Sequence, residues 1–392
     1  MKYLIRLLTI LLVILFPLGL LLRIKLSTNV FVNPSDIVVL FLTFLIWFID
    51  YKEKKIFKDR FYFFQFLFLI SGVVSLIINT LFHPEINIFI SILYALRYAC
   101  YLSLTKVGVY FGKSKKILPI LYTSALSFVI FGYIQFFLYN DMRKLFYLGW
   151  DEHLYRLFST LFDPNFAGMS LVIIFFLFLP KAVSKSFKRG YPFIIINFFT
   201  IVAIFITYSR TALIALFVGL VVLGILNHKI KHLLILILAS MILLLTVSDT
   251  SIEGLNPFRT VSTRERVRSI TEVTKIISSQ PLEGAGFNAF RYAQVRYGFR
   301  TSVGVALSNS DAGTDNSFLF VEATTGIAGF LFYSLSYFFL IKTLMEEHKK
   351  SNMYIVSMIF SALAGSMFLN VLFYTPFLIL FFLLIALREK LN

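Results

Sequence analysis

The sequence predicts an all-α integral membrane protein with about twelve transmembrane helices. Two observations support this class. The 392 residues are 58% hydrophobic and 18% aromatic, with a mean hydropathy of +0.84, which is too apolar for an ordinary soluble domain. The apolar residues also form long runs separated by short charged loops, and a helix satisfies its own backbone hydrogen bonds in hydrocarbon.

Twelve apolar runs are predicted to span the membrane. The first begins near Lys2 and Arg6 like a secretory leader, but it lacks a small-residue cleavage pattern and is interpreted as a span. Several runs are short for a bilayer core about 30 Å thick, which a helix of about 20 residues crosses. The predicted spans are residues 4–22, 37–49, 61–81, 86–111, 117–139, 165–180, 192–207, 211–226, 232–247, 317–341, 352–371 and 373–387.

The distribution of lysine predicts the orientation. With both termini in the cytoplasm, every cytoplasmic loop carries basic residues, as the positive-inside rule requires. The formal charge of +17 then reflects loops that face anionic membrane lipid, so nucleic acid is not an expected partner. The predicted inside residues are Lys52, Lys54, Lys55, Lys58, Arg60, Lys113, Lys115, Lys116, Lys181, Lys185, Lys188, Arg189, Lys229, Lys231, Lys342, Lys349, Lys350, Arg388 and Lys390.

One outside segment is long enough for structure of its own. We therefore divide the chain into residues 1–247 with spans one to nine, a long and partly helical periplasmic loop at 248–316, and residues 317–392 with spans ten to twelve. The loop carries seven arginines and one lysine, although basic residues are usually scarce outside. Guanidinium groups stay charged and match phosphate oxygens in pairs, so these arginines indicate phosphate binding.

A helix is predicted in the first half of this loop. Ser262 and Glu265 have the spacing of a capping box, with Ser262 as the N-cap. Apolar residues then recur at helical spacing as far as Pro281, at Val267, Ile270, Val273 and Ile277. The first two turns would hold three arginines beside free amides and a positive dipole, which favours anions; they are Arg264, Arg266 and Arg268.

Four segments of the chain form a pattern by their order and spacing. They are Asp163-Pro164-Asn165-Phe166-Ala167-Gly168; Thr207-Tyr208-Ser209-Arg210-Thr211-Ala212; Arg266, fifteen residues ahead of Pro281-Leu282-Glu283-Gly284-Ala285-Gly286-Phe287; and Asp315-Asn316-Ser317-Phe318-Leu319 with Glu322 and Thr325-Gly326-Ile327-Ala328-Gly329. This pattern resembles the O-antigen polymerase and ligase superfamily of bacterial envelope glycosyltransferases. The resemblance covers about residues 160–335 and implies a GT-C-like fold. Members of this superfamily act on glycans linked through pyrophosphate to a polyprenyl lipid, on the periplasmic face of the bacterial inner membrane.

The resemblance implies that Arg210 and Arg266 hold the donor pyrophosphate, and Arg264 is grouped with them. A departing pyrophosphate gains negative charge in the transition state, and fixed guanidinium groups would stabilise it without a metal. The alternatives are that Arg210 snorkels at a helix end and that Arg266 lies on the solvated face of its helix.

Asp315 is the candidate base. Ligases of the superfamily usually carry His-Asn where this chain has Asp315 and Asn316. A carboxylate near the acceptor sugar hydroxyl can accept its proton as the glycosidic bond forms. Asp315 could instead, or in addition, cap the N-terminus of the tenth span.

Other candidate residues have weaker patterns. Arg97 lies in the fourth span, where a substrate contact or a structural ion pair would compensate its charge. Asp163, before Pro164, is interpreted as a helix N-cap. Arg291 and Asn316 are candidate substrate contacts. The alternative for Arg291, Arg296 and Arg300 is that water solvates them. Asp151, Glu152 and His153 could supply another base, sugar contacts or only a solvated loop. Cys100 is the single cysteine and the histidines are dispersed, so neither a metal site nor a cofactor is expected.

The sequence therefore predicts an inverting, metal-independent polysaccharide polymerase of lipopolysaccharide biosynthesis. It would transfer a growing glycan from polyprenyl pyrophosphate to a lipid-linked repeat unit, with Asp315 activating the acceptor. The expected partners are a polyprenyl-pyrophosphate-linked oligosaccharide, membrane lipid and a chain-length regulator. An O-antigen ligase that transfers the glycan to lipid A core or another acceptor is the first alternative, and a transporter of the same lipid-linked sugar is the second.

Overall fold

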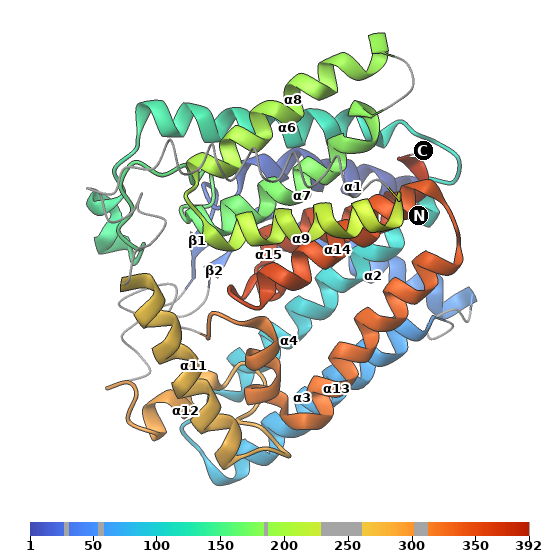
Figure 1. Cartoon of the computed structure of the whole chain (residues 1–392). Helices are drawn as coiled ribbons and strands as arrows, with labels where there is room; N and C mark the ends of the chain where they lie inside the picture. Colours follow the sequence, from blue (N-terminus) through green and yellow to red (C-terminus); the bar gives the residue numbers. More distant parts are fainter. Residues whose placement is uncertain (27–30, 54–58, 184–186, 229–260, 302–312, 392) are drawn as a thin grey trace.

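A computed structural model describes residues 1–391 except 27–30, 54–58, 184–186, 229–260 and 302–312 (Figure 1). The protein is 76% helical. Within the described residues the only sheet is a small antiparallel hairpin of β1 (Ile24–Lys25) and β2 (Phe31–Val32), which pairs Ile24 with Val32. The fold is thus all-α, as the sequence predicts.

The long helices follow the apolar runs of the sequence. They are α1 (Lys2–Leu15), α2 (Pro34–Glu53), α3 (Arg60–Phe82), α4 (Ile88–Leu102), α6 (Ile117–Leu138), α7 (Pro164–Ala182), α8 (Phe187–Ile206), α9 (Arg210–Leu226), α13 (Ser317–Glu346), α14 (Lys350–Ser366) and α15 (Thr375–Leu387). Shorter elements are η1 (Phe16–Leu18), η2 (Ser103–Lys106), α5 (Val107–Tyr110), η3 (Arg143–Leu148), η5 (Val371–Phe373) and η6 (Arg388–Lys390). The region predicted as the long loop contains α11 (Val261–Ser279) and α12 (Phe290–Arg296).

Helices occupy eleven of the twelve predicted spans. The remaining one, the ninth at residues 232–247, lies outside the described residues. Among the described residues, six helical segments are long and apolar enough to cross a membrane: Pro34–Tyr51, Arg60–Phe82, Ile88–Tyr110, Ile117–Leu138, Pro164–Ala182 and Ser317–Glu346. Gly190–Ile206 and Arg210–Leu226 are shorter apolar helices. The chain is therefore a multi-pass membrane protein, while the count of twelve spans and the domain limits stay predictions.

The core is built around helices that are apolar on every side. All residues of α15 from Pro376 to Leu387 are buried, and so are most of those in α7. A helix without a polar face has to be surrounded by other helices or by lipid. Figure 1 shows α7, α9, α14 and α15 together in the bundle, with α3 and α13 side by side along one edge.

Polar side chains join α3 to α13. Gln65 Nε2 donates to Ser336 Oγ at 2.8 Å, and Ser75 Oγ donates to the carbonyl oxygen of Thr324 at 2.9 Å. Apolar surface alone gives little preference for one helix partner within a membrane, so buried hydrogen bonds of this kind help to fix the pairing.

A kink in α13 positions the loop that precedes α12. Gly326 has φ 66° and ψ −175°, which interrupts the helix. A Cβ at Gly326 would lie 1.9 Å from the carbonyl oxygen of Leu282, and one at Gly284 would lie 2.5 Å from the Gly326 nitrogen. The glycine turn at 284–286 therefore makes a close backbone approach, and its partner is the kink.

The two termini lie at the same end of the bundle. Arg6 Nε donates to the carbonyl oxygen of Tyr110 at 2.6 Å, and Lys390 Nζ donates to that of Gly112. Both ends of the chain thus contact the turn after α5, and Figure 1 shows them close together. This arrangement agrees with the predicted orientation, in which both termini face the same side.

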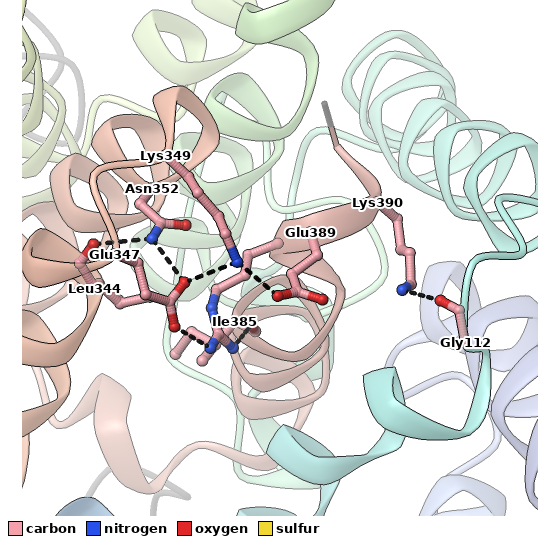
Figure 2. Close-up of polar contacts among 9 residues, drawn as sticks. Gly112, Leu344, Glu347, Lys349, Asn352, Ile385, Glu389 and Lys390 are labelled. Carbon is pink, nitrogen blue, oxygen red and sulfur yellow. Dashed lines mark hydrogen bonds and ion pairs between the residues drawn. The ribbon is translucent and has the colours of Figure 1, made fainter.

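Charged side chains tie the ends of α13 and α15 together at this end (Figure 2). Arg388 Nη2 lies 3.0 Å from Glu347 Oε1, and Lys349 Nζ lies 2.7 Å from Glu389 Oε1. Asn352 Nδ2 also donates to Glu347 Oε2 at 3.0 Å. The lysine-rich end of the molecule is therefore also held by ion pairs.

Candidate active site

A cavity of about 1380 Å³ opens at the end of the bundle opposite to the termini. Its walls come from segments that are far apart in the sequence: the first loop, residues 149–166, α11, residues 313–315 and residues 368–378. All of these segments belong to the membrane side that the sequence predicts to be outside. The N-terminal ends of α7 and α15 contribute to the wall, and their positive dipole ends favour an anion.

Helix α11 turns two polar residues toward the membrane helices. Arg266 is half-buried, and Arg266 Nη2 donates to Thr211 Oγ1 at 3.0 Å. One turn later, Ser269 Oγ lies 3.0 Å from Thr314 Oγ1 and accepts a 3.5 Å hydrogen bond from the Asp315 nitrogen. Arg266 and Ser269 share a face with Val273 and Ile276, which are completely buried. Arg266 therefore does not lie on a solvated helix face.

The helix predicted here is present as α11, but its apolar pattern does not match its buried face in the first two turns. Val267 is 59% exposed and Ile270 is 47% exposed, whereas Val273 is buried as predicted. The helix also begins at Val261, so Ser262 lies inside the first turn and is not the residue that precedes it. The polar contacts of Arg266 and Ser269 determine the rotation of this half of the helix, and the apolar pattern does not.

Arg266 has Asp315 and Arg210 as electrostatic neighbours. Burial lowers the pKa of Arg266, Asp315 acts in the opposite direction, and the charge of Arg210 adds to the lowering. Arg210 begins α9, and its Nε atom is buried. Asp315 and Arg210 thus each lie within interaction range of Arg266. Arg266 and Asp315 line the cavity, and Arg210 is not among the residues that line it.

Asp315 is accessible to the cavity, yet the surrounding protein replaces much of its water. This burial raises the pKa of its carboxyl group; Arg266 acts against the rise, and the negative charges of Asp151 and Glu265 add to it. A carboxylate with a raised pKa is a stronger base than an ordinary one.

Asn316, and not Asp315, caps α13. Asn316 Oδ1 accepts hydrogen bonds from the nitrogens of Phe318 and Leu319 at 2.9 and 3.0 Å, and its Nδ2 donates to the carbonyl oxygen of Met367. The alternative in which Asp315 is the N-cap is therefore wrong. Since Asn316 satisfies the first amides of the helix, the Asp315 carboxylate is not committed to them.

The other arginines discussed from the long loop divide into those that line the cavity and those that do not. Arg264 is exposed, and neither Arg264 nor Arg291 lines the cavity. Arg296 Nη2 lies 3.4 Å from Glu85 Oε1, also away from the cavity. Arg268 and Arg300 do line it, and Arg268 Nε lies 2.8 Å from Glu272 Oε1. The structure thus brings Arg266 into the site without Arg264 or Arg291.

Arg97 forms the structural ion pair that was considered for it. Its Nε and Nη2 atoms donate to the two carboxylate oxygens of Asp36 at 2.9 and 2.6 Å, and Tyr101 also donates to Asp36. This bidentate pair compensates the charge within the span. Arg97 also lines the cavity, so the ion pair and a substrate contact are compatible.

A second set of titratable groups lies on the wall formed by residues 149–166. Asp163 caps α7 as predicted, through hydrogen bonds from the nitrogens of Asn165 and Phe166. Burial, with a further contribution from Asp151, raises the pKa of Asp163 to about 6. Asp151, His153 and Asp163 each place one ligand atom within 4.8 Å of the others, which is close enough to hold a cation. Sequence spacing gave no signal for this cluster, because Asp163 is ten residues away from its nearest partner.

Arg156 is a structural residue that the sequence did not distinguish. It is 4% exposed, and its Nε donates to the carbonyl oxygen of Thr207 at 2.8 Å. Its Nη2 donates to Asn165 Oδ1 at 3.3 Å, so Arg156 links the start of α7 to the turn before α9. A single arginine in a medium-length loop carries no pattern from which this burial could be inferred.

Comparison with known protein families supplies the deciding observation. Residues 195–334 match the family described as O-antigen ligase. This part of the chain is therefore similar to that family, which supports the predicted resemblance to the O-antigen polymerase and ligase superfamily. The matched segment runs from α8 to α13 and contains Arg210, Arg266 and Asp315. No curated protein sequence matches the chain significantly.

The segments that carry the superfamily resemblance contact one another in the folded chain. A Cβ at Gly168 would lie 2.7 Å from Ala212 Cβ, so segments 163–168 and 207–212 touch. The bond from Arg266 to Thr211 connects α11 to the second of these segments. Segment 281–287 packs on the α13 kink through the hydrogen bond from the Ala285 nitrogen to the Ala323 carbonyl oxygen at 2.8 Å. Motifs dispersed over residues 160–335 are thus connected by packing and hydrogen bonds.

Proposed function

We propose that this protein is a polysaccharide polymerase of the O-antigen type. Its substrates would be glycans linked to polyprenyl pyrophosphate, and it would act at the periplasmic face of the bacterial inner membrane, with both termini in the cytoplasm. The observation that carries the proposal is the position of Arg266, between Arg210 and Asp315 at the edge of a large cavity. A chain-length regulator is a further proposed partner.

Arg266 and Arg210 supply the positive charge that stabilises the leaving pyrophosphate. The acceptor hydroxyl oxygen attacks the anomeric carbon of the donor, and the bond from that carbon to the pyrophosphate oxygen breaks with its electron pair on the pyrophosphate. The leaving group gains negative charge, which Arg266 and Arg210 stabilise more strongly in the transition state than in the ground state. Direct displacement inverts the anomeric centre. No metal ion is part of the proposed mechanism.

Asp315 receives the proton. Its carboxylate faces the cavity beside Arg266, and its pKa is raised by burial, so it accepts the proton of the acceptor hydroxyl as the new bond forms. The protonated Asp315 then returns its proton to water or to the released pyrophosphate. Because Asn316 caps α13, this proton transfer does not disturb the helix end.

The test is a reconstituted reaction. Purified protein in lipid nanodiscs is incubated with lipid-linked repeat units alone, and the products are separated by length. A ladder of glycans supports the polymerase, and this ladder should be lost in Arg266→Gln. If longer products never form from repeat units alone, the polymerase proposal is rejected.

An O-antigen ligase is the second candidate, because the matched family is described by that activity. In the same reaction it would give product only after lipid A core or another acceptor is added. The transporter alternative predicts a different result for Arg210→Ala: the lipid-linked substrate would fail to cross the membrane while the length distribution of existing polymer stayed unchanged.

A further inference from the structure

A turn of three residues, 207–209, joins α8 to α9 and sets the position at which α9 begins. Arg210 is the first residue of α9, and the next residue, Thr211, accepts the hydrogen bond of Arg266. A shift of this turn would therefore displace both arginines that are proposed to bind pyrophosphate. The contacts that hold the turn also hold this part of the site.

The backbone of the turn has a conformation that needs support from its surroundings. Tyr208 has φ 49°, in the left-handed region, which a tyrosine adopts only where other contacts hold it. Thr207 and Ser209 on either side are completely buried. Because α8 ends at Ile206, the carbonyl oxygens that follow are not paired within that helix, and buried carbonyl groups require other donors.

Arg156 supplies these donors. Its Nε donates to the carbonyl oxygen of Thr207 at 2.8 Å, and its Nη2 donates to that of Tyr208 at 3.5 Å. The planar fork of a guanidinium group reaches two acceptors in fixed directions, and the negative end of the α8 dipole favours a cation here. Arg156 is almost completely buried, so water does not compete for these carbonyl groups.

The segment that carries Arg156 is itself anchored to α6. Gln135, on α6, accepts a hydrogen bond at its Oε1 from the nitrogen of Phe158 at 2.7 Å. The nitrogen of Leu157 donates to the carbonyl oxygen of Ile206 at 3.1 Å, directly before the turn. Arg156 therefore extends from a fixed support, and its hydrogen bonds fix the turn relative to that support.

Helix α7 packs against the same turn. A Cβ at Gly168 would lie 3.1 Å from Thr207 Oγ1 and 3.3 Å from Ser209 Cβ, so the helix and the turn are in close contact. Arg156 Nη2 also donates to Asn165 Oδ1 at 3.3 Å, in the first turn of α7. Packing on α7 and the hydrogen bonds of Arg156 together leave the turn little freedom to move.

We propose that Arg156 is a positioning residue for the arginines that bind pyrophosphate, because it holds the turn from which α9 begins. The connection runs from Arg156 to Thr207 at 2.8 Å, along the turn to Thr211, and from Thr211 to Arg266 at 3.0 Å. This inference rests on the proposed function. Arg156 precedes the segments that carry the family resemblance and lies outside the matched residues 195–334.

A double-mutant cycle tests this connection. Full-length protein in nanodiscs is titrated with farnesyl pyrophosphate, a short polyprenyl pyrophosphate, and the dissociation constants are measured at equilibrium. Arg156→Lys keeps the charge but loses the fork, and Thr211→Val removes the acceptor of Arg266, so each should weaken binding about tenfold. If both act through the same path, the double variant should also lose about tenfold, whereas independent effects multiply to about 100-fold.

Hydrogen exchange separates this effect from general unfolding. In Arg156→Lys, the amides of residues 207–213 should exchange about tenfold faster than in the wild type, while the amides of α15 keep their wild-type rates. Arg296→Gln removes a mostly buried arginine outside the cavity and should change neither this exchange nor the binding. If Arg156→Lys does not fold, Arg156→Gln, which keeps an N–H donor without the charge, takes its place.

The inference is overturned if the effects of Arg156→Lys and Thr211→Val multiply, or if the exchange of residues 207–213 is unchanged. Either result together with a normal glycan ladder would reject the positioning role and leave the polymerase standing. Coupled effects on farnesyl pyrophosphate binding without any ladder would instead reject the polymerase and keep the role of Arg156. The two failures are therefore distinguishable.

Discussion

Arg266 Nη2 donates a 3.0 Å hydrogen bond to Thr211 Oγ1, which joins α11 to the first turn of α9. Thr211 is completely buried, so this hydroxyl group is shielded from water and holds the guanidinium group in one orientation. Because Arg210 is the preceding residue, the same bond also fixes the spacing between the two arginines that are proposed to bind pyrophosphate.

Thr211→Val removes this hydroxyl group with little change in volume. We expect kcat/KM for polymerisation to fall about tenfold, since a hydrogen bond to a charged group contributes about 1.5–3 kcal/mol, while the thermal midpoint changes little. Thr211→Ser keeps the hydroxyl group and should retain most of the activity. A Thr211→Val enzyme with wild-type kinetics would show that Thr211 does not position Arg266.

Asp315→Asn and Asn316→Ala should separate catalysis from helix capping. Asp315→Asn removes the proposed base, so we expect polymerisation to fall about 100-fold or more with an unchanged thermal midpoint. Asn316→Ala removes the cap of α13, which typically costs about 1 kcal/mol, so it should lower the thermal midpoint. The assignment fails if Asp315→Asn is fully active at every pH.

The activity should decrease on the acid side at a higher pH than the ordinary range of an aspartate. Burial and the charge of Asp151 raise the pKa of Asp315, and the active base is the ionised form, which is lost as the pH falls through this raised pKa. Asp151→Asn removes a negative neighbour and should move the acid limb of the kcat profile to lower pH. A limb that does not move would mean that another group is the base.

The raised pKa of Asp163 should make the folded state more stable at low pH than at pH values above this pKa. The folded pKa of Asp163 is about 6, above the ordinary aspartate value of 3.8, so the folded state binds more protons between these values. Stability from this group is therefore present at low pH and lost as the pH rises through about 6. Asp163→Asn keeps a capping oxygen and should flatten this part of the pH dependence of the thermal midpoint. A difference between wild type and variant that is independent of pH would contradict this expectation.

The cluster of Asp151, His153 and Asp163 permits a direct test of the metal-independent mechanism. Their ligand atoms lie within 4.8 Å of one another, yet the proposed reaction uses only Arg266 and Arg210 to balance the pyrophosphate charge. We therefore expect polymerisation to be unaffected when EDTA is present in both the purification and the reaction. Loss of the ladder with EDTA, followed by recovery with a divalent cation, would assign a catalytic ion to this cluster.

The sequence predicted those features that depend on neighbouring residues. Apolar runs located the helices, and Asp163 with Pro164 gave the α7 cap. The local sequence pattern did not predict orientation where a contact between distant residues fixes the direction of a side chain. Arg266 faces inward because Thr211 accepts its hydrogen bond, although Val267 and Ile270 have the spacing of an apolar face.

Contacts between residues far apart in the sequence also explain the other differences between the predicted and the observed site. Asp315 and Asn316 are adjacent and both are good caps, and Asn316 alone can donate to the Met367 carbonyl oxygen while it accepts from the helix amides. The convergence of Asp151 with Asp163, and of Arg156 with Thr207, depends on loops that only the folded chain brings together. Residue type indicated phosphate chemistry, but it could not assign these positions.

Gly326→Ala should destabilise the protein far more than Gly298→Ala. Both glycines have positive φ, 66° and 74°, so each substitution has the strain of a left-handed alanine, about 1 kcal/mol. A Cβ at Gly326 would also lie 1.9 Å from the Leu282 carbonyl oxygen, whereas nothing lies within 4 Å at Gly298. Gly326→Ala therefore has to displace the 281–287 turn, which connects α11 to the α13 kink, and we expect loss of both thermal stability and farnesyl pyrophosphate binding. Equal thermal midpoints for the two variants would show that the kink and the turn are not coupled.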